Sequence, residues 1–177
     1  MEFDLQPTLT GPGLTLRPLR PEDRETLWQV ARDPLIWDQH PDQTRYQRAG
    51  FERFFNGLIA SPGALAVVEN SSGQIIGVTR YYEWDDDLRE ITIGHTFLAR
   101  DYWGTGANRE MKQLLIEHAR PHVAAIWFHV GKCNLRSQRA MEKLGAVPMH
   151  EGQRPQNGVM VDFIYYRIQP AHWHAAH

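Results

Sequence analysis

The sequence predicts an α/β (α+β) domain built on a mixed, mainly antiparallel sheet of six to seven strands that is flanked by about four helices. Three β-prone segments follow one another between residues 64 and 98, and hairpin signals join them. Beyond residue 98, helix and strand patterns alternate, which is typical of a sheet covered by helices. The 177 residues are enough for one domain with a sizeable core. We therefore expect a single domain over 1–177, with its core at 10–168 and a tail at 169–177.

The N-terminal part predicts one strand and two helices. Apolar and polar residues alternate over 14–19, which predicts the first strand. Pro21 suits the first turn of a helix, and Asp33 ends that helix because the residue before a proline avoids helical backbone angles. The segment from Thr44 to Gln47 fits a capping box, so we expect the second helix to begin there. Its apolar face carries Phe51, Phe54, Phe55, Leu58 and Ile59.

The rest of the chain predicts six strands and two helices. Hairpin chemistry at 70–73 and an acidic turn at 83–87 separate the first three of these strands. One helix begins near Ala107, and a second is capped by Asn134 and ended by Gly145. The expected strands lie at 64–69, 74–82, 89–98, 123–130, 147–151 and 158–168.

Composition and charge exclude several classes of function. The formal net charge is −2 and no Lys/Arg block interleaves with aromatic residues, so we expect no nucleic-acid partner. No apolar run approaches the roughly 20 residues of a membrane span, and the N-terminus lacks a signal-peptide pattern. The single cysteine forbids an internal disulfide, which fits a reducing compartment. We therefore expect a cytoplasmic protein without a membrane partner.

The tail carries His172, His174 and His177, which could chelate a metal ion. Histidines at a chain end are usually frayed and unoccupied, so we expect no metal site. The sequence does not decide the oligomeric state, and we leave a homodimer open.

The stretch around Gly104-Thr105-Gly106 carries the clearest chemical signal. It lies between a strand that ends at Leu98 and a helix that begins near Ala107. Glycines let a backbone approach a phosphate closely, and the first amides of a helix have no intrahelical partner. The helix dipole adds only about 0.3–1 kcal/mol, so directed N–H bonds would carry most of such a site. An ordinary strand-to-helix turn explains the spacing equally well.

Further motifs resemble a known family. The run from Asn134 to Gly145, Asn-Leu-Arg-Ser-Gln-Arg-Ala-Met-Glu-Lys-Leu-Gly, follows the glycine turn as in the GNAT acetyltransferase superfamily, and the order of elements is similar too. Leu-Arg-Pro-Leu-Arg-Pro-Glu-Asp at 16–23 and Trp-Gly-Thr-Gly-Ala at 103–107 resemble its branch related to ribosomal-protein N-terminal acetyltransferases. The similarity covers about residues 10 to 168. Two separated motifs in the right order are more specific than the glycine turn alone.

The resemblance implies transfer of an acetyl group from acetyl-CoA to a primary amine, on a small molecule or a protein N-terminus. It implies that the CoA pyrophosphate binds on the glycine turn and helix start, that the pantetheine amides pair with the preceding strand, and that the second motif lines the cofactor, with Ser137 among its residues. The implied cofactor-binding residues are Phe97, Leu98, Ala99, Trp103, Gly104, Thr105, Gly106, Ala107, Asn108, Asn134 and Arg136.

Two departures from the family pattern bear on catalysis. Met141 stands where many members have a tyrosine that protonates the leaving thiolate, and Thr92 stands where many relatives carry a basic glutamate. By analogy we assign Ser137 as the proton donor. We assign Glu90 as the base because strand alternation puts it on the face of Thr92, although a solvated charge explains Glu90 equally well. His95 shares the opposite face with Ile91, Ile93 and Phe97, where it is either a base or a hydrogen-bonded core residue.

These departures keep a second class of function open. A non-catalytic acyl-CoA-binding or regulatory domain on the same scaffold needs neither the tyrosine nor the glutamate. Release of coenzyme A on addition of a panel of amines distinguishes the two functions.

The loop at 34–41 is the expected wall of the acceptor pocket, because in the family this region overhangs the cleft opposite the cofactor. We expect the facing strands to contribute a tyrosine and Glu90. An aromatic wall with a carboxylate suits an amine on a partly apolar body. Alternatively, Trp37 only packs the loop onto the second helix. The expected substrate-binding residues are Trp37, His40 and Tyr81 or Tyr82.

Overall fold

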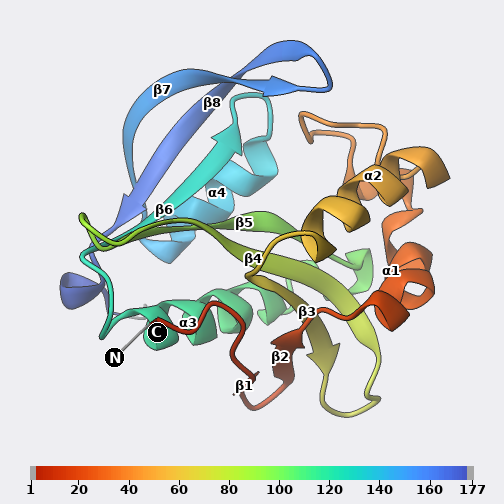
Figure 1. The fold of residues 1–177 in the computed structure, drawn as a ribbon, viewed down its shortest axis with the longest axis horizontal. Coiled ribbons are helices and arrows are strands. Elements are labelled where there is room, and N and C mark those ends of the chain that lie inside the picture. Colours follow the sequence, from red (N-terminus) through yellow and green to blue (C-terminus); the bar gives the residue numbers. More distant parts are fainter. Residues whose placement is uncertain (1–2, 175–177) are drawn as a thin grey trace.

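The computed structural model describes residues 3–174, which form an eight-stranded sheet flanked by four α-helices (Figure 1). The strands are β1 (Leu9–Thr10), β2 (Leu14–Pro18), β3 (Ala64–Glu69), β4 (Ile75–Asp85), β5 (Glu90–Leu98), β6 (Ala125–Gly131), β7 (Val147–Gln156) and β8 (Val159–Ile168). The helices are α1 (Arg24–Ala31), α2 (Arg48–Ile59), α3 (Ala107–Ala119) and α4 (Leu135–Leu144). None of the helices in the described range is long and apolar enough to cross a membrane.

The strands lie in the spatial order β1-β2-β3-β4-β5-β6-β8-β7. Every neighbouring pair is antiparallel except β5 and β6, which are parallel and are connected through α3. The mixed, mostly antiparallel fold is therefore confirmed, with eight strands instead of six to seven. The additional strand is β1, whose two residues pair with Leu16 and Thr15 of β2 and are too few to show an alternating pattern.

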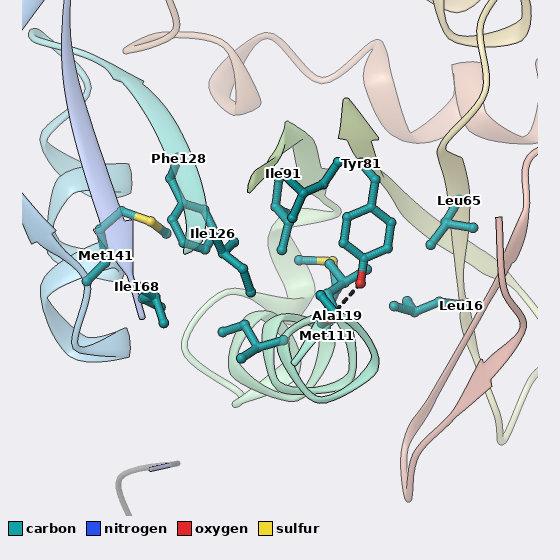
Figure 2. Close-up of a cluster of buried hydrophobic side chains, with 14 of the residues drawn as sticks. Leu16, Leu65, Tyr81, Ile91, Met111, Ala119, Ile126, Phe128, Met141 and Ile168 are labelled. Carbon is teal, nitrogen blue, oxygen red and sulfur yellow. Dashed lines mark hydrogen bonds between the residues drawn. The ribbon is translucent and has the colours of Figure 1, made fainter. Parts of the chain in front are cut away.

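Helices cover both faces of the sheet and bury a core on each. Alternate residues of β3 face the two cores, as the two-residue period of a strand requires. Each fully buried large apolar side chain contributes about 1.5–3 kcal/mol. The core beneath α3 and α4 includes Ile91, Met111, Leu115, Ile126, Phe128 and Met141 (Figure 2). The core beneath α1 and α2 includes Leu27, Ala31, Phe51, Phe55 and Leu58.

Helix α2 begins later than predicted. It starts at Arg48 and not at Thr44, and its N-cap residue Gln47 makes no side-chain capping bond. The reason is Asp42, whose Oδ1 accepts hydrogen bonds from the backbone N–H of Thr44 (3.0 Å) and from its hydroxyl (2.6 Å). The Thr44 hydroxyl is thus engaged in a local turn and does not cap a helix.

Two strands run further than predicted. Strand β4 continues through Asp85, so the acidic turn lies at 86–89. The Asp85 carboxylate accepts a hydrogen bond from the backbone N–H of Leu88 (2.8 Å) and fixes this turn. Strand β7 continues to Gln156 because its pairing with β8 extends to the tip of the hairpin, where Gln156 faces Val159.

Candidate active site

The glycine turn ends in a set of free backbone amides. Gly104 and Gly106 have φ angles of 75° and 95°, in the left-handed region that side chains disfavour, so glycine is required at both positions. Within the described part of the chain, five backbone N–H groups of this segment donate to no acceptor, those of Gly104, Thr105, Gly106, Asn108 and Arg109. Unsatisfied amides gathered at a helix start are suited to bind an anion.

Beside this turn, β5 and β6 part from each other. They pair over only three residues of each strand, 90–92 of β5 with 125–127 of β6. Further along, the register of β5 against β4 shifts, and His95 adopts a φ of 50°, which is uncommon for a residue other than glycine. The two strands no longer pair beyond the shared segment, and residues of both strands beyond it line the cleft described below.

The bulge also changes which side chains share a face. Ile91 and Ile93 lie in the core beneath α3, whereas Phe97 lies in the opposite core beside Trp37, with ring centroids 4.9 Å apart. The prediction that Phe97 shares the face of Ile93 is therefore wrong. The bulge places two residues of β5, His95 and Thr96, opposite one of β4, Thr79, which reverses the alternation beyond it.

A cleft of about 1310 Å³ opens along the glycine turn, the split strands, α4 and the loop before α2. Three of the predicted cofactor residues, Ala99, Thr105 and Ala107, do not line it. Ala99 instead donates its N–H to Ile76 of β4 (2.7 Å), and the Thr105 hydroxyl donates to the carbonyl of Tyr102 (2.8 Å). The predicted residues that line the cleft are Phe97, Leu98, Trp103, Gly104, Gly106, Asn108, Asn134, Arg136 and Ser137.

Helix α4 places Ser137 at the cleft. The Asn134 side chain accepts a hydrogen bond from the Ser137 backbone N–H (3.1 Å), and Gly145 ends the helix with a φ of 82°. Both caps match the prediction. The Ser137 hydroxyl makes no hydrogen bond to any residue in the described range, and Met141, one helical turn later, supplies only a thioether.

Arg136 joins α4 to the loop before α2. Its guanidinium lies 4.1 Å from the centroid of the Trp103 ring and donates hydrogen bonds to Asp38 (3.2 Å) and to the carbonyl of Ile36 (3.0 Å). The Trp103 Nε1–H is itself bound to the carbonyl of Leu98 (3.0 Å). Arg136 is therefore held in place between a fixed ring and a loop.

Trp37, His40 and Tyr82, the residues expected to bind the acceptor, line the same cleft. Trp37 is only 2% exposed, and its Nε1–H donates to the carbonyl of Ala31 (2.7 Å). It is thus a core residue as well as a wall. The hydroxyl of Tyr82 lies 3.2 Å from Nδ1 of His129, which also lines the cleft.

The structure does not bring Tyr81 or Glu90 to the cleft. Tyr81 is fully buried beneath the sheet, where its hydroxyl donates to the carbonyl of Leu115 (2.5 Å; Figure 2) and burial raises its pKa well above the ordinary value. Glu90 lies where β5 and β6 are still paired and accepts a hydrogen bond from Nε1 of Trp127 (2.8 Å). The expectation that Glu90 faces the reacting group is corrected, because the strands part only beyond it.

Sequence reasoning missed several basic groups of the site. Seven Arg or Lys side chains line the cleft but only one carboxylate among the described residues, Glu83. One signal was available: Lys112 falls on the apolar face of α3, three and four residues before Leu115 and Ile116. The basic side chains are Arg45, Arg109, Lys112, Arg136, Arg139, Lys143 and Arg154.

Two neutral imidazoles also line the cleft. Burial, followed by the charge of Arg45, lowers the pKa values of His40 and His95 to about 3. The Nδ1 atom of His95 is buried without a hydrogen-bond partner among the described residues. The neutral His95 ring lines the cleft, and one of the two nitrogens of a neutral imidazole can accept a hydrogen bond.

Taken with its free amides and unpaired strand edges, the cleft fits a long ligand that has a phosphate group at one end and amides along its length. Aromatic rings and imidazoles line the same cleft, among them Trp37, His40 and Tyr82.

Comparison with known proteins supports the same reading of the fold. The structure is similar to that of a GCN5-related N-acetyltransferase from Brucella melitensis, with a TM-score of 0.83 and 18% sequence identity. The match covers 95% of this chain and 80% of the Brucella protein. A GNAT-family acetyltransferase from Bacillus anthracis matches with a TM-score of 0.72 and 17% identity, over 93% of this chain and 99% of that protein. A provisionally named ribosomal-protein-serine acetyltransferase from Vibrio cholerae matches with a TM-score of 0.74 and 17% identity, over 94% of this chain and 99% of that protein.

These structural likenesses show the fold, and the sequence adds the family. Residues 13–147 match the family described as Acetyltransferase (GNAT) domain. That range contains the glycine turn, the split between β5 and β6 and all of α4. The chain therefore belongs to the GNAT acetyltransferase family.

Proposed function

We propose that the protein is an N-acetyltransferase that moves an acetyl group from acetyl-CoA to a primary amine, on a small molecule or a protein N-terminus. The observation that carries this proposal is the group of five backbone amides, in the glycine turn and the first turn of α3, that find no acceptor among residues 3–174 and lie beside the cleft. Family membership supports acyl transfer, and the free amides support a donor that carries phosphate.

The residues present fit coenzyme A. The amides of the glycine turn would hold the pyrophosphate, and Arg139 and Lys143 of α4 add positive charge along the same cleft. The unpaired edge of β5 around Phe97 and Leu98 would pair with the pantetheine amides, as an added strand does. When bound, acetyl-CoA supplies the activated acetyl group.

The acceptor amine must be neutral to react. At pH 7 deprotonation costs about 1.4 kcal/mol for an α-amine and about 4.6 kcal/mol for a lysine side chain, from their ordinary pKa values. Within the cleft, the neutral His95 ring accepts a hydrogen bond from the amine and orients it. The proton then leaves through water, because Glu90 lies outside the cleft. The lower cost favours an α-amine acceptor.

An α-amine acceptor also fits the branch related to ribosomal-protein N-terminal acetyltransferases, which is our proposal within the family. The segments at 16–23 and 103–107 support it, as does the fold shared with the Vibrio cholerae protein. Peptides with a free N-terminal amine should therefore react faster than peptides whose only amine is a lysine side chain.

Calorimetry and thiol release test the proposal. We expect coenzyme A to bind with much higher affinity than pantetheine, which lacks the phosphates. We also expect that amines from a panel release coenzyme A from acetyl-CoA. Equal affinity for the two compounds would exclude the phosphate site. Tight binding of acetyl-CoA without release by any amine would favour the alternative, a non-catalytic acyl-CoA-binding or regulatory domain.

Ser137 is the proposed donor of a hydrogen bond to the departing sulfur, since its hydroxyl is free and lies on the cleft. We expect Ser137→Ala to lower kcat about tenfold with little change in affinity for coenzyme A. This effect is at the low end of the range for general acid catalysis, because a thiolate is a good leaving group. Steady-state kinetics alongside calorimetry measure both quantities. Unchanged kcat would remove this role.

A further inference from the structure

Lys112 is a buried amine at the place where β5 and β6 part. It lies on α3, is 3% exposed and lines the cleft. Its Nζ donates to the hydroxyl of Thr96 on β5 (2.9 Å) and lies 5.6 Å from the centroid of the Phe128 ring on β6. The amine therefore lies at the cleft, beside residues of both strands.

No acidic group compensates this amine. In the described part of the chain it forms no ion pair, and burial alone lowers its pKa to about 7. The titratable cleft groups on the neighbouring strands are His95 and His129, whose pKa values burial lowers to about 3 and about 4, so both are neutral at pH 7. Lys112 is thus an isolated amine that takes up and gives up a proton near neutral pH.

The ammonium form has more donors than the protein satisfies. An ammonium group has three N–H bonds, and within residues 3–174 only one finds an acceptor, the hydroxyl of Thr96. Thr96 is in turn fixed by the hydroxyl of Thr79 (2.8 Å). The other N–H bonds have no acceptor among the described residues, and the cleft is the space that adjoins them. A hydrophobic residue of similar length would fill this position at lower energy, so the amine needs another explanation.

We propose that Lys112 holds at Nζ the proton that the sulfur of coenzyme A receives when the acetyl group leaves it. This inference rests on the proposed function. As the bond from the acceptor nitrogen to the acetyl carbon forms and the C–S bond breaks, Nζ gives its proton to the sulfur. The neutral Nζ then recovers, through water, the proton that the acceptor nitrogen loses.

The chemistry of the site suits this role better than Ser137 alone does. A neutral hydroxyl holds its proton more tightly than a thiol, so Ser137 can orient the sulfur but is a weak source of a proton. An ordinary thiol has a pKa of about 8.5, above that of Lys112, so transfer from Nζ is favourable. Met141, on the neighbouring wall, offers no proton.

The protonation state of Lys112 can be measured by NMR because the chain has few lysines. The sequence has only three, Lys112, Lys132 and Lys143, so NMR of lysine-labelled protein gives three side-chain signals. We expect one signal to titrate near pH 7, to vanish in Lys112→Met and to persist in Lys132→Arg. Coenzyme A should move this signal and its titration midpoint by about one pH unit, whereas desulfo-coenzyme A should not. A lysine that titrates only above pH 9, or equal responses to the two compounds, would overturn the proposal.

Kinetics and mass spectrometry supply the second arm. Lys112→Met should lower kcat about 10- to 100-fold while KM for acetyl-CoA changes less than threefold. The fall in wild-type kcat above pH 7, as Nζ loses its proton, should be absent in this variant. The role would be overturned if Lys112→Met had the same kcat as the wild type, or if mass spectrometry found an acetyl group on Lys112 of the wild type. An absence of turnover with every amine would reject the proposed function, while the sulfur-dependent NMR shift would still report the contact.

Discussion

At the residue scale, the environment of Lys112 predicts how stability depends on pH. Its pKa is about 7 in the folded chain and about 10.4 in the unfolded one, so between these values the unfolded state binds more protons. Stability therefore rises with pH in this window and is lowest below pH 7, where the charge stays buried. The full difference amounts to about 5 kcal/mol, as an upper limit.

The measurement is the free energy of unfolding in urea from pH 7 to 9.5, a range below the titration of the buried tyrosines. We expect the wild type to gain stability across this range. Lys112→Met should be more stable than the wild type at pH 7 and should lack the gain, whereas Lys143→Met, on α4, should keep it. A flat profile for the wild type would contradict the buried, uncompensated charge.

Trp37 is a residue whose two predicted roles coincide. It lines the cleft, but it also packs on Phe97 and donates to the carbonyl of Ala31. We therefore expect Trp37→Ala to cost about 3–5 kcal/mol of stability and to raise the acceptor KM without changing KM for acetyl-CoA. Thermal unfolding and kinetics with each substrate varied measure these effects.

The control for this substitution is Trp84→Ala. Trp84 is partly buried against the core beneath α3 and does not line the cleft. The Trp84→Ala variant should be less stable than the wild type but should have unchanged KM values for the acceptor and for acetyl-CoA. An acceptor KM unchanged in Trp37→Ala would leave Trp37 as a packing residue only.

At the scale of elements, the glycine turn and the start of α3 should act as one anion site. Gly106→Val places a β-branched residue at a φ of 95°, although its Cβ would meet no other atom within 4 Å. The strain should rearrange the free amides, and the side chain should obstruct a phosphate. We expect affinity for coenzyme A, measured by calorimetry, to fall at least tenfold.

Gly73→Val is the matched control. Gly73 also has a positive φ, 69°, with open space around its Cβ, but it lies in the turn between β3 and β4 and not on the cleft. It should lose similar stability and bind coenzyme A normally. Equal losses of affinity in both variants would show that the effect comes from general destabilisation.

The elements also show what the sequence could and could not predict. The order of strands and helices, the glycine turn and the caps of α4 follow from local patterns, because period, turn residues and capping residues act within a few positions. The bulge at His95 does not, since it depends on pairing with β4. That one residue moved Phe97 to the opposite face, and the point where β5 and β6 part left Glu90 outside the cleft.

The later start of α2 has a similar origin. The capping pattern at Thr44 is real in sequence, but the Asp42 carboxylate competes for the same hydroxyl and amide. Tyr81 and Tyr82 illustrate the limit for single positions: adjacent residues of a strand face opposite sides, and only the structure shows which one lines the cleft.

At the scale of the whole molecule, charge is distributed unevenly. The chain carries a net charge of −2, yet the described residues that line the cleft include seven Arg or Lys side chains and one carboxylate. A concave basic surface on a slightly acidic protein concentrates anions at the site and leaves the rest of the surface unattractive to them. The carboxylate on the cleft is Glu83, not the expected Glu90, and it lies among basic and imidazole groups.

This distribution predicts a salt dependence that is specific to the phosphate-bearing ligand. Raising NaCl from 50 to 500 mM shortens the screening length from roughly 14 to 4 Å, so affinity for coenzyme A should fall about tenfold while affinity for pantetheine stays constant. Calorimetry at several salt concentrations measures both. Arg139→Gln should weaken binding of coenzyme A and reduce the salt dependence. Arg32→Gln makes the same change in net charge away from the cleft and should do neither. If both variants responded alike, the net charge of the molecule, and not the basic cleft, would govern recognition of the donor.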